Sequence, residues 1–251
     1  MAHRFFRTAK ATDIVEKLVT KLVYEHAIIE EGDRILIAVS GGKDSTILAW
    51  ALSKIRPTLK RNYTLTAIHI SSDFCACCKK SALEQRLNAW DIPFVDRFVP
   101  IIGRLKTGKS MNCYWCSTQR RLELLNYATE HHFNKLALGH HLDDIIETFF
   151  MNLTIKGTFS TMALSMPYRN YPVRIIRPLA YLEEQQIIAC AAEQHILNNM
   201  CTCPYGMRSE RRVMRARIAN FTHNSSAVKR HILHALLNSP VFAGNNKESQ
   251  G

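Results

Sequence analysis

Hydrophobic residues along the chain follow two spacings that alternate with each other. Short continuous apolar runs, several of them rich in β-branched residues, are typical of strands buried on both faces. Between them lie longer segments whose apolar residues recur every three or four positions, the spacing of an amphipathic helix. Strands are expected at residues 35–39, 65–70, 94–99, 135–138 and 173–176, and helices at 11–29, from 44 onward, at 82–90, 120–132, 143–153 and through 190–191.

This alternation predicts both the fold class and a division of the chain. Strands separated by helices at this spacing form an open parallel sheet with helices on both faces, an α/β fold. We expect an N-terminal helix within residues 1–30, the α/β domain over 31–200, a basic helical segment over 201–240 and a disordered tail over 241–251. Residues 101–112 contain two glycines and several Lys and Arg, and are expected to form a mobile basic loop.

The composition narrows the class of protein. A chain of 251 residues, 47% hydrophobic and 22% charged, can bury one α/β domain with a modest addition. No apolar run is long enough to span a membrane and the N-terminus lacks the apolar core of a signal peptide, so a cytoplasmic protein is expected. In that reducing compartment, eight cysteines favour metal or catalytic sulfur over disulfides. The net charge of +12 favours a polyanionic partner.

The first candidate site follows the expected strand at 35–39. The sequence Ser-Gly-Gly-Lys-Asp-Ser there comprises Ser40, Gly41, Gly42, Lys43, Asp44 and Ser45. Paired glycines allow a tight turn and the close approach of a ligand, and backbone amides at the start of the next helix attract phosphate. A Walker A loop would need Ser or Thr directly after the lysine, and the dinucleotide pattern Gly-x-Gly-x-x-Gly is absent. The segment therefore predicts a nucleotide-phosphate site of another type.

The second candidate site follows the expected strand at 135–138. Gly139, His140 and His141 precede Asp143 and Asp144, which stand at a predicted helix start. Ligands of open α/β sheets bind at the carboxyl ends of the strands, and two carboxylates placed there can hold a magnesium ion. Capping of the helix would equally explain one of the two aspartates.

The cysteines suggest a third site. Cys113 and Cys116 form a Cys-x-x-Cys pair directly before the predicted helix at 120–132, and Cys201 and Cys203 follow late in the chain. A lone Cys-x-x-Cys can be redox-active, can bind zinc or can be accidental, but two cysteines with a distant third favour a shared metal. Thiolates suit zinc and iron–sulfur clusters alike, so the spacing leaves the metal open. Three further cysteines could carry persulfide or bind metal, but are more simply interpreted as buried or partly exposed thiols: Cys75, Cys77 and Cys78. Cys190 falls in an apolar helical pattern and is expected in the core.

Together these motifs resemble one family. Ser-Gly-Gly-Lys-Asp-Ser is similar to the pyrophosphate loop of the PP-loop ATP pyrophosphatases, and Gly-His-His-x-x-Asp-Asp is similar to the second signature of the PP-loop enzymes that thiolate tRNA. With Cys-x-x-Cys, Ile-Arg-Pro-Leu and a late cysteine, the order of motifs resembles the tRNA 2-thiocytidine synthetases and their 2-thiouridine relatives over residues 32–217.

The resemblance implies a [4Fe–4S] cluster held by three cysteines, with one iron open for sulfide. Cys113 and Cys116 would be two of its ligands, and Cys201 or Cys203 the third, with Cys201 favoured. A zinc ion that uses both late cysteines is the alternative.

The resemblance also implies ATP and Mg²⁺ as cofactors, with adenine near His69 and Ile70. Arg121, or its neighbour Arg120, is assigned to the support of the phosphate or the base only because it follows the cysteine pair closely. The expected partners are tRNA and a cysteine desulfurase or other sulfur donor, with a homodimer allowed.

Basic side chains gather in two stretches. Residues 205–223 combine an apolar stripe with an adjoining face of arginines, and nearby residues extend it: Arg208, Arg211, Arg212, Arg215, Lys229, Arg230 and His231. Three more cations lie in the basic loop: Arg104, Lys106 and Lys109. Both stretches predict contacts with an RNA phosphate backbone. Tyr114 and Trp115 can stack an unpaired base or pack around the cluster.

The sequence therefore favours an enzyme that thiolates cytidine in the anticodon loop of tRNA. ATP would adenylate the base, with Lys43 stabilising the charge on the phosphates, and sulfur would then displace AMP. One alternative is a PP-loop ligase similar to lysidine synthetase with a structural zinc, which would tolerate loss of the cysteines. The other is a non-catalytic ATP-sensing RNA-binding module, which would release no pyrophosphate.

Overall fold

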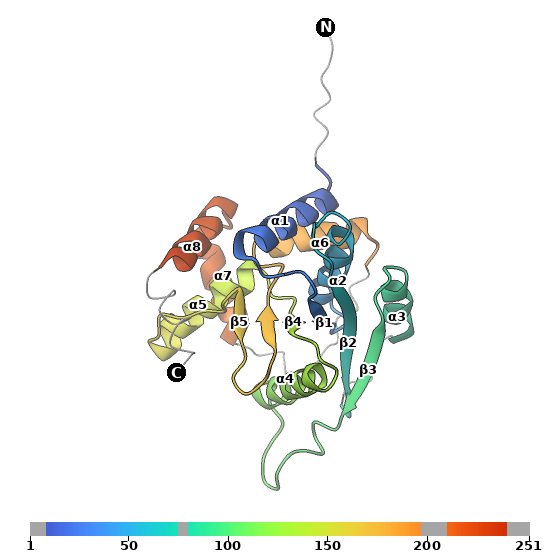
Figure 1. The fold of residues 1–251 in the computed structure, drawn as a ribbon. Helices are drawn as coiled ribbons and strands as arrows, with labels where there is room; N and C mark the ends of the chain where they lie inside the picture. Colours follow the sequence, from blue (N-terminus) through green and yellow to red (C-terminus); the bar gives the residue numbers. More distant parts are fainter. Residues whose placement is uncertain (1–8, 75–79, 197–209, 240–251) are drawn as a thin grey trace.

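A six-stranded sheet runs through the centre of the computed structural model, which describes residues 9–74, 80–196 and 210–239 (Figure 1). The strand order is β3-β2-β1-β4-β6-β5. The strands are β1 (Arg34–Ala38), β2 (Thr64–Ser72), β3 (Phe94–Val99), β4 (Lys135–Ala137), β5 (Ser165–Pro167) and β6 (Arg174–Ile176). Neighbouring strands are parallel, except that β5 pairs with β6 in the antiparallel direction.

Helices cover both faces of the sheet, which confirms the predicted fold class. They are α1 (Ala11–His26), α2 (Lys43–Ile55), α3 (Lys80–Asn88), α4 (Cys113–Glu130), α5 (Leu142–Lys156), α6 (Glu184–Glu193), α7 (Glu210–Thr222) and α8 (Ser226–Asn238). Helices α1, α2 and α6 pack against one another over one face, whereas α4 covers the opposite face (Figure 1). Helices α7 and α8 both lie against α5. None of the helices in the described ranges is long and apolar enough to cross a membrane.

The strands are continuous apolar runs because both faces of the sheet are covered. Ile35 and Ile37 of β1 belong to the larger core with α1, α2 and α6, whereas Leu36 points to the other face. There it joins Ile68 of β2 and Leu136 of β4 in the core beneath α4. Successive side chains of a strand point to opposite faces, so a strand buried on both sides has no polar positions to alternate with.

Two elements differ from the sequence-based expectation. Helix α4 begins at Cys113 and not at residue 120, because the side chain of Asn112 accepts a hydrogen bond of 2.8 Å from the backbone N–H of Trp115 and caps the helix. The expectation that the Cys-x-x-Cys pair precedes this helix was therefore wrong: both cysteines lie in its first turn. The short strand β5 was not predicted. Residues 101–112 contain neither helix nor strand, as expected for a loop.

The strand order creates one position where loops diverge. From β1 the chain proceeds outward through β2 and β3, and then crosses to the other side of β1 to form β4 and β6. The pairing of Ile37 with Ala137 brings the carboxyl ends of β1 and β4 to the same level. In open α/β sheets, ligands bind in the crevice at such a switch in strand order. The two loops expected to bind nucleotide follow these two strands.

Candidate functional site

The loop after β1 has the shape of a phosphate cradle. Gly41 has φ +82°, which a side chain would strain, and the chain then enters α2 at Lys43. The Ser45 hydroxyl accepts a hydrogen bond of 3.0 Å from the Ser40 backbone N–H and donates one of 3.1 Å to the carbonyl of Gly42. The serine hydroxyls thus hold the loop in shape. The backbone amides in the first turn of α2 have no partner within the helix, which leaves them available to an anion.

The loop after β4 touches this cradle. A Cβ placed on Gly139 would lie 3.0 Å from the backbone nitrogen of Ser45 and 3.1 Å from its Cα. Only glycine therefore allows the two loops to approach so closely, because the opposing atoms belong to a helix backbone and cannot move aside. The structure thus brings the two sequence-predicted nucleotide loops into contact.

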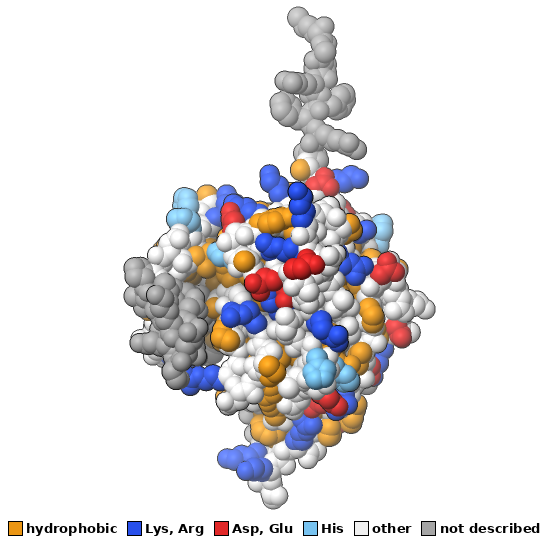
Figure 2. Space-filling view, in the orientation of Figure 1, with side chains coloured by type: hydrophobic (Ala, Val, Ile, Leu, Met, Phe, Trp, Pro, Cys, Tyr) orange, Lys and Arg blue, Asp and Glu red, His pale blue; other side chains and the backbone are white. Residues whose placement is uncertain are grey.

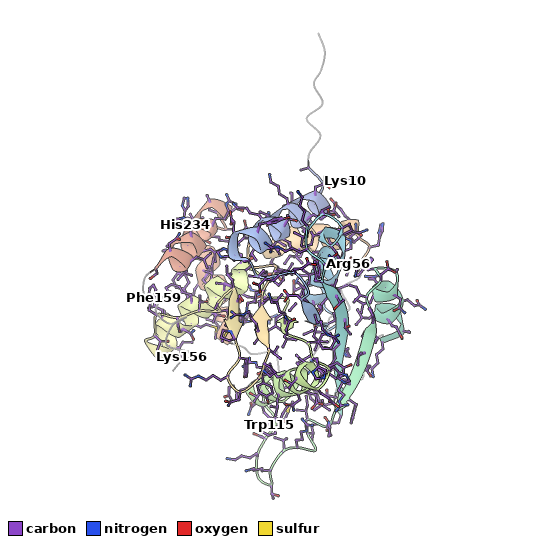
Figure 3. All side chains as sticks on the ribbon, in the orientation of Figure 1. Lys10, Arg56, Trp115, Lys156, Phe159 and His234 are labelled. Atoms are coloured by element: carbon purple, nitrogen blue, oxygen red, sulfur yellow. The ribbon has the colours of Figure 1, made fainter. Side chains whose placement is uncertain are left out.

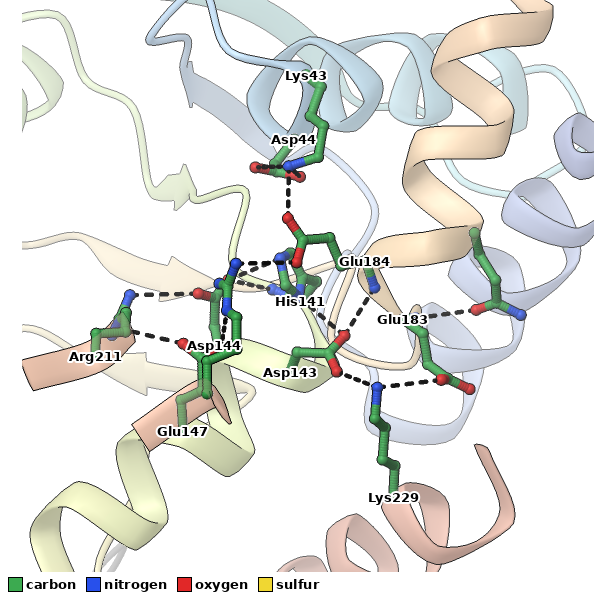
Figure 4. Close-up of polar contacts among 12 residues, drawn as sticks. Lys43, Asp44, His141, Asp143, Asp144, Glu147, Glu183, Glu184, Arg211 and Lys229 are labelled. Atoms are coloured by element: carbon green, nitrogen blue, oxygen red, sulfur yellow. Dashed lines mark hydrogen bonds and ion pairs between the residues drawn. The ribbon is translucent and has the colours of Figure 1, made fainter. Parts of the chain in front are cut away.

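Lys43 of the cradle is held by two carboxylates (Figure 4). Its Nζ lies 2.9 Å from Oε1 of Glu184, at the start of α6, and 3.2 Å from Oδ1 of Asp44. Burial alone would lower the pKa of Lys43, but the hydrogen bond that Lys43 donates to Glu184 and the charges of both carboxylates outweigh it and leave that pKa raised. Lys43 is therefore a firmly protonated cation beside the cradle.

The two aspartates of the second loop have different partners (Figure 4). Asp143 accepts hydrogen bonds of 2.6 Å from Nζ of Lys229 on α8 and 2.7 Å from the backbone N–H of Glu184. Burial raises the pKa of Asp143, but these two donors outweigh it and the pKa is lowered overall. Asp144 accepts a hydrogen bond of 3.1 Å from the backbone N–H of His141 and closes the capping box of α5. The capping explanation thus holds for Asp144.

Two arginines of α7 complete this network of ion pairs. NH1 of Arg211 lies 3.3 Å from Oδ1 of Asp144, and Nε of Arg215 lies 2.6 Å from Oε1 of Glu147. Arg215 also reaches Oε2 of Glu184 at 3.1 Å. The sequence predicted that both arginines face an RNA backbone. The structure pairs both with carboxylates of α5 and α6, which couples α7 directly to the nucleotide loops, and the expected RNA contact stays a prediction.

Behind the second loop lies a pair that the sequence analysis did not connect: it named His140 as a site residue and quoted the Ile-Arg-Pro-Leu motif, but gave Arg177 of that motif no role. Arg177, which follows β6, is 6% exposed and donates from Nε to Nδ1 of His140 at 3.3 Å. Burial, reinforced by the charge of Arg177, lowers the pKa of His140 to about 4, so that the ring is neutral near pH 7. Glu147, Glu183 and Glu184 were also missed. A signal existed for Arg177, since a charged residue directly after a buried strand lies at the ligand-binding edge.

The cysteine pair follows the carboxyl end of β3, the end of the sheet at which the two nucleotide loops also lie. Cys113 is exposed and Cys116 half-buried, both in the first turn of α4, and spacing of i and i+3 places them on one helix face. Two sulfur atoms on one helix face suit metal ligation. Within the described ranges no group of three or more His, Cys, Asp or Glu is arranged to hold a metal ion. Cys201 and Cys203 lie outside those ranges, as do Cys75, Cys77 and Cys78, and Cys190 is buried in the core as predicted.

The residues assigned to adenine are buried in β2. His69 is 1% exposed, and its Nδ1 lies 2.8 Å from the carbonyl oxygen of Val39, just before the cradle. Its Nε2 has no hydrogen-bond partner among the residues that the structure describes. Burial lowers the pKa of His69, and the charge of Arg120 on α4 contributes to the lowering. Burial, reinforced by the charge of Arg121, lowers the pKa of Arg177 to about 10. Ile70 packs in the core beneath α4.

Comparison with known proteins identifies the family. The family model for the PP-loop domain matches residues 11–221 of the chain. The chain belongs to the PP-loop family. This PP-loop protein is 35% identical over 230 residues to the tRNA-cytidine(32) 2-sulfurtransferase of Geobacter metallireducens, an alignment covering 88% of this chain and 87% of that protein. It is also 35% identical over 229 residues to the protein of the same name from Geobacter sulfurreducens, covering 89% of each. The resemblance noted in the sequence is confirmed.

Solved structures show that the PP-loop fold is shared with more distant proteins. The U34-tRNA thiolase NcsA from Methanococcus maripaludis, solved with its [4Fe-4S] cluster, superposes with a TM-score of 0.75 at 23% identity, covering 90% of this chain and 77% of that one. The NMN synthetase of Francisella tularensis superposes with a TM-score of 0.52 at 13% identity, covering 94% and 91%. At these identities the likeness is evidence for the fold alone.

Proposed function

We propose that this protein is an ATP-dependent tRNA sulfurtransferase that forms 2-thiocytidine in the anticodon loop. The observation that carries the proposal is the contact between Gly139 and Ser45, which joins two nucleotide loops at the switch point of the sheet. The relatives named tRNA-cytidine(32) 2-sulfurtransferase cover almost the whole chain and support the choice of substrate. A protein of this kind acts on tRNA in the cytoplasm and needs a sulfur donor.

The adenylation half of the reaction uses the paired loops. The phosphates of ATP bind over residues 40–45, with adenine near His69 and Ile70. The O2 oxygen of the cytosine attacks the α-phosphorus, which forms an adenylated base and releases pyrophosphate. Lys43 and the amides of the cradle stabilise the charge that develops on the phosphates. Asp143 and Asp144 are the candidate Mg²⁺ ligands, since hard cations prefer carboxylate oxygens.

The sulfur half uses the cysteines. Cys113, Cys116 and one of Cys201 and Cys203 would hold a [4Fe–4S] cluster, which supplies a binding site for sulfide. Sulfide adds at C2 of the activated base, and AMP departs with the former O2 oxygen. Arg121 supports the departing phosphate. The two thiolates at the helix start fit such a group, because their donor chemistry and common face suit a soft metal.

The test is anaerobic reconstitution with iron and sulfide. The wild-type protein should gain the visible absorption of an iron–sulfur cluster, and should release pyrophosphate and thiolate tRNA when given ATP and sulfide. Cys113→Ala should lose absorption and thiolation but keep ATP binding. Cys190→Ala, which alters a core thiol away from the loops, should keep both and serves as the matched control.

Other results would point to the alternative functions. Bound zinc without iron, together with thiolation or ligation that survives Cys113→Ala, would contradict the cluster and favour a ligase. No release of pyrophosphate with any tRNA would favour the non-catalytic ATP-sensing module.

A further inference from the structure

A small cavity lies beside the cysteine pair, between the 101–112 loop and the start of α4. Its volume is about 300 Å³, and its walls are Leu105, Lys106, Lys109, Ser110, Asn112, Tyr114 and Trp115. Figure 1 shows this loop extending from the end of β3 to the start of α4 at the lower end of the molecule, and Figure 3 labels Trp115 at its base. We refer to this cavity as the loop pocket. A pocket of this volume is at the small end of ligand sites, which suits one nucleotide better than a duplex.

The walls of the loop pocket are fixed by contacts to the rest of the fold. The carboxylate of Asp73, just after β2, accepts hydrogen bonds of 3.0 to 3.1 Å from the backbone N–H groups of Ile102 and Gly103. NH2 of Arg104 lies 3.2 Å from Oε2 of Glu123 on α4. The indole N–H of Trp115 donates to the carbonyl of Ile101 at 3.1 Å. The loop that carries the pocket is thus held to α4 and to the segment that follows β2.

The loop pocket carries uncompensated positive charge. Neither Lys106 nor Lys109 forms an ion pair with any residue in the described part of the chain, and no carboxylate lines the pocket. The neighbouring Arg104, by contrast, is neutralised by Glu123. In Figure 2, Lys and Arg side chains are spread over the visible face, and some of them lie at the lower tip of the molecule, where this loop projects. The chemistry of the pocket therefore fits an anion.

The loop pocket also presents an aromatic ring to solvent. The side chain of Tyr114 is 82% exposed, whereas Trp115, next to it, packs against the core beneath α4. An exposed aromatic ring next to free lysines is the combination that binds unpaired nucleotides, because the base stacks on the ring while the phosphates meet the cations. The wall of the pocket is largely apolar, which suits a stacked base, and the two lysines in the same wall favour a nucleic acid over a protein partner.

We propose that the loop pocket binds one unpaired nucleotide of the tRNA loop, next to the nucleotide that is modified. The base stacks on Tyr114, and its flanking phosphates contact Lys106 and Lys109. Cys113 lies between Asn112 and Tyr114 in the sequence but is not part of the pocket wall. The pocket is therefore assigned to a nucleotide that neighbours the modified one, and the modified base itself faces the cysteines. This inference deepens the proposed function and rests on it for the identity of the RNA.

The test measures binding of an anticodon stem–loop RNA, and of the same stem closed as a plain duplex. Tyr114→Ala should weaken binding of the stem–loop about tenfold, in line with the contribution of one stacked base, and leave duplex binding unchanged. Tyr114→Phe should retain the wild-type affinity. Lys106→Glu and Lys109→Glu should each weaken binding and reduce its salt dependence by about one ion. Tyr24→Ala and Lys17→Glu, on the distant helix α1, are the matched controls.

Three outcomes would overturn the proposal. Wild-type affinity in Tyr114→Ala would exclude the pocket as an RNA site. Equal losses in Tyr114→Ala and Tyr114→Phe would exclude stacking. The variants could also keep their RNA affinity and lose thiolation only when a protein donor replaces free sulfide. That result would assign the pocket to the sulfur donor. A wild-type protein that shows the Tyr114-dependent RNA binding but never thiolates would contradict the proposed function and leave this inference standing.

Discussion

Substitution of Glu184 by glutamine should tighten the binding of ATP, even though it removes a carboxylate from the nucleotide site. Nζ of Lys43 lies 2.9 Å from Oε1 of Glu184, so the phosphates of ATP must displace this carboxylate before they can use the lysine. Glutamine has nearly the same shape but no charge. In Glu184→Gln the lysine is available from the start, and the incoming phosphates meet less negative charge.

The size of the effect follows from the geometry. Two unit charges 2.9 Å apart attract by about 1.4 kcal/mol in bulk water and by about 6 kcal/mol at an effective dielectric constant of 20. The side chains of Lys43 and Glu184 are 10% and 25% exposed, so water screens the pair in part, and Arg215 already compensates some of the charge on Glu184. We therefore take ~1–2 kcal/mol, which corresponds to a decrease in Kd of about 5- to 30-fold.

The assay is calorimetric titration with a non-hydrolysable ATP analogue and Mg²⁺, without tRNA. Lys43→Met should lose affinity, and the gain from Glu184→Gln should disappear when both changes are combined, because the two residues act through one pair. Glu25→Gln, at an exposed site on α1, controls for a change in net charge. Unchanged or weaker binding in Glu184→Gln would refute the reasoning, since the carboxylate would then assist the nucleotide.

Three further predictions concern the packing and protonation of the site. Gly139→Ala should lower ATP affinity at least tenfold in the same titration, because the methyl group of the alanine would lie 3.0 Å from the backbone nitrogen of Ser45. Full affinity would show that the two loops can separate freely. Arg215→Ala should cost about 1.5–3 kcal/mol of unfolding free energy in urea, because Glu147 is 2% exposed, loses its nearest cation at 2.6 Å and keeps only Arg211 at 3.6 Å. A loss below about 0.5 kcal/mol would show that Arg211 or water compensates for the missing side chain. In the folded state the pKa of His140 is lowered to about 4, below its value of about 6.5 in the unfolded chain. Between these pH values the unfolded chain therefore binds more protons than the folded one. The free energy of unfolding should consequently fall by up to about 3 kcal/mol as the pH decreases from 6.5 to 4. Urea unfolding at several pH values should show a smaller decrease in His140→Gln, and equal slopes for both proteins would contradict the assignment.

The strands and the nucleotide loops could be predicted from the sequence because their signals are local. The strand expected at 94–99 coincides with β3 (Phe94–Val99), and the pattern after β1 placed the cradle and the start of α2 within a residue. A buried parallel strand, a glycine turn and a helix start all leave marks within a dozen residues. Strand β5 left no such mark, because three residues containing a proline carry no periodicity.

The partners of the site residues could not be predicted, because they come from distant parts of the chain. Lys229 is 86 residues from Asp143 and Arg215 is 68 residues from Glu147, and nothing in either segment specifies the other. From their charge alone, the arginines of 205–223 were predicted to contact RNA. Their ion pairs with α5 and α6 could not be predicted, because such pairs depend on how the helices pack together. The start of α4 was missed for a related reason: Cys, Tyr and Trp are weak helix formers, and the cap at Asn112 alone fixes the boundary.

The position of Cys113 and Cys116 inside α4 has a consequence for changes in chain length. Each residue of an α-helix advances the side-chain direction by about 100°. One residue inserted after Cys116 would therefore rotate both cysteines away from Arg120 and Arg121, although every motif would remain intact in the sequence. The same residue inserted after Gly108 would lengthen a turn and preserve the helical phase. The relative placement of the proposed cluster ligands and these arginines therefore depends on the rotation of the helix as much as on distance.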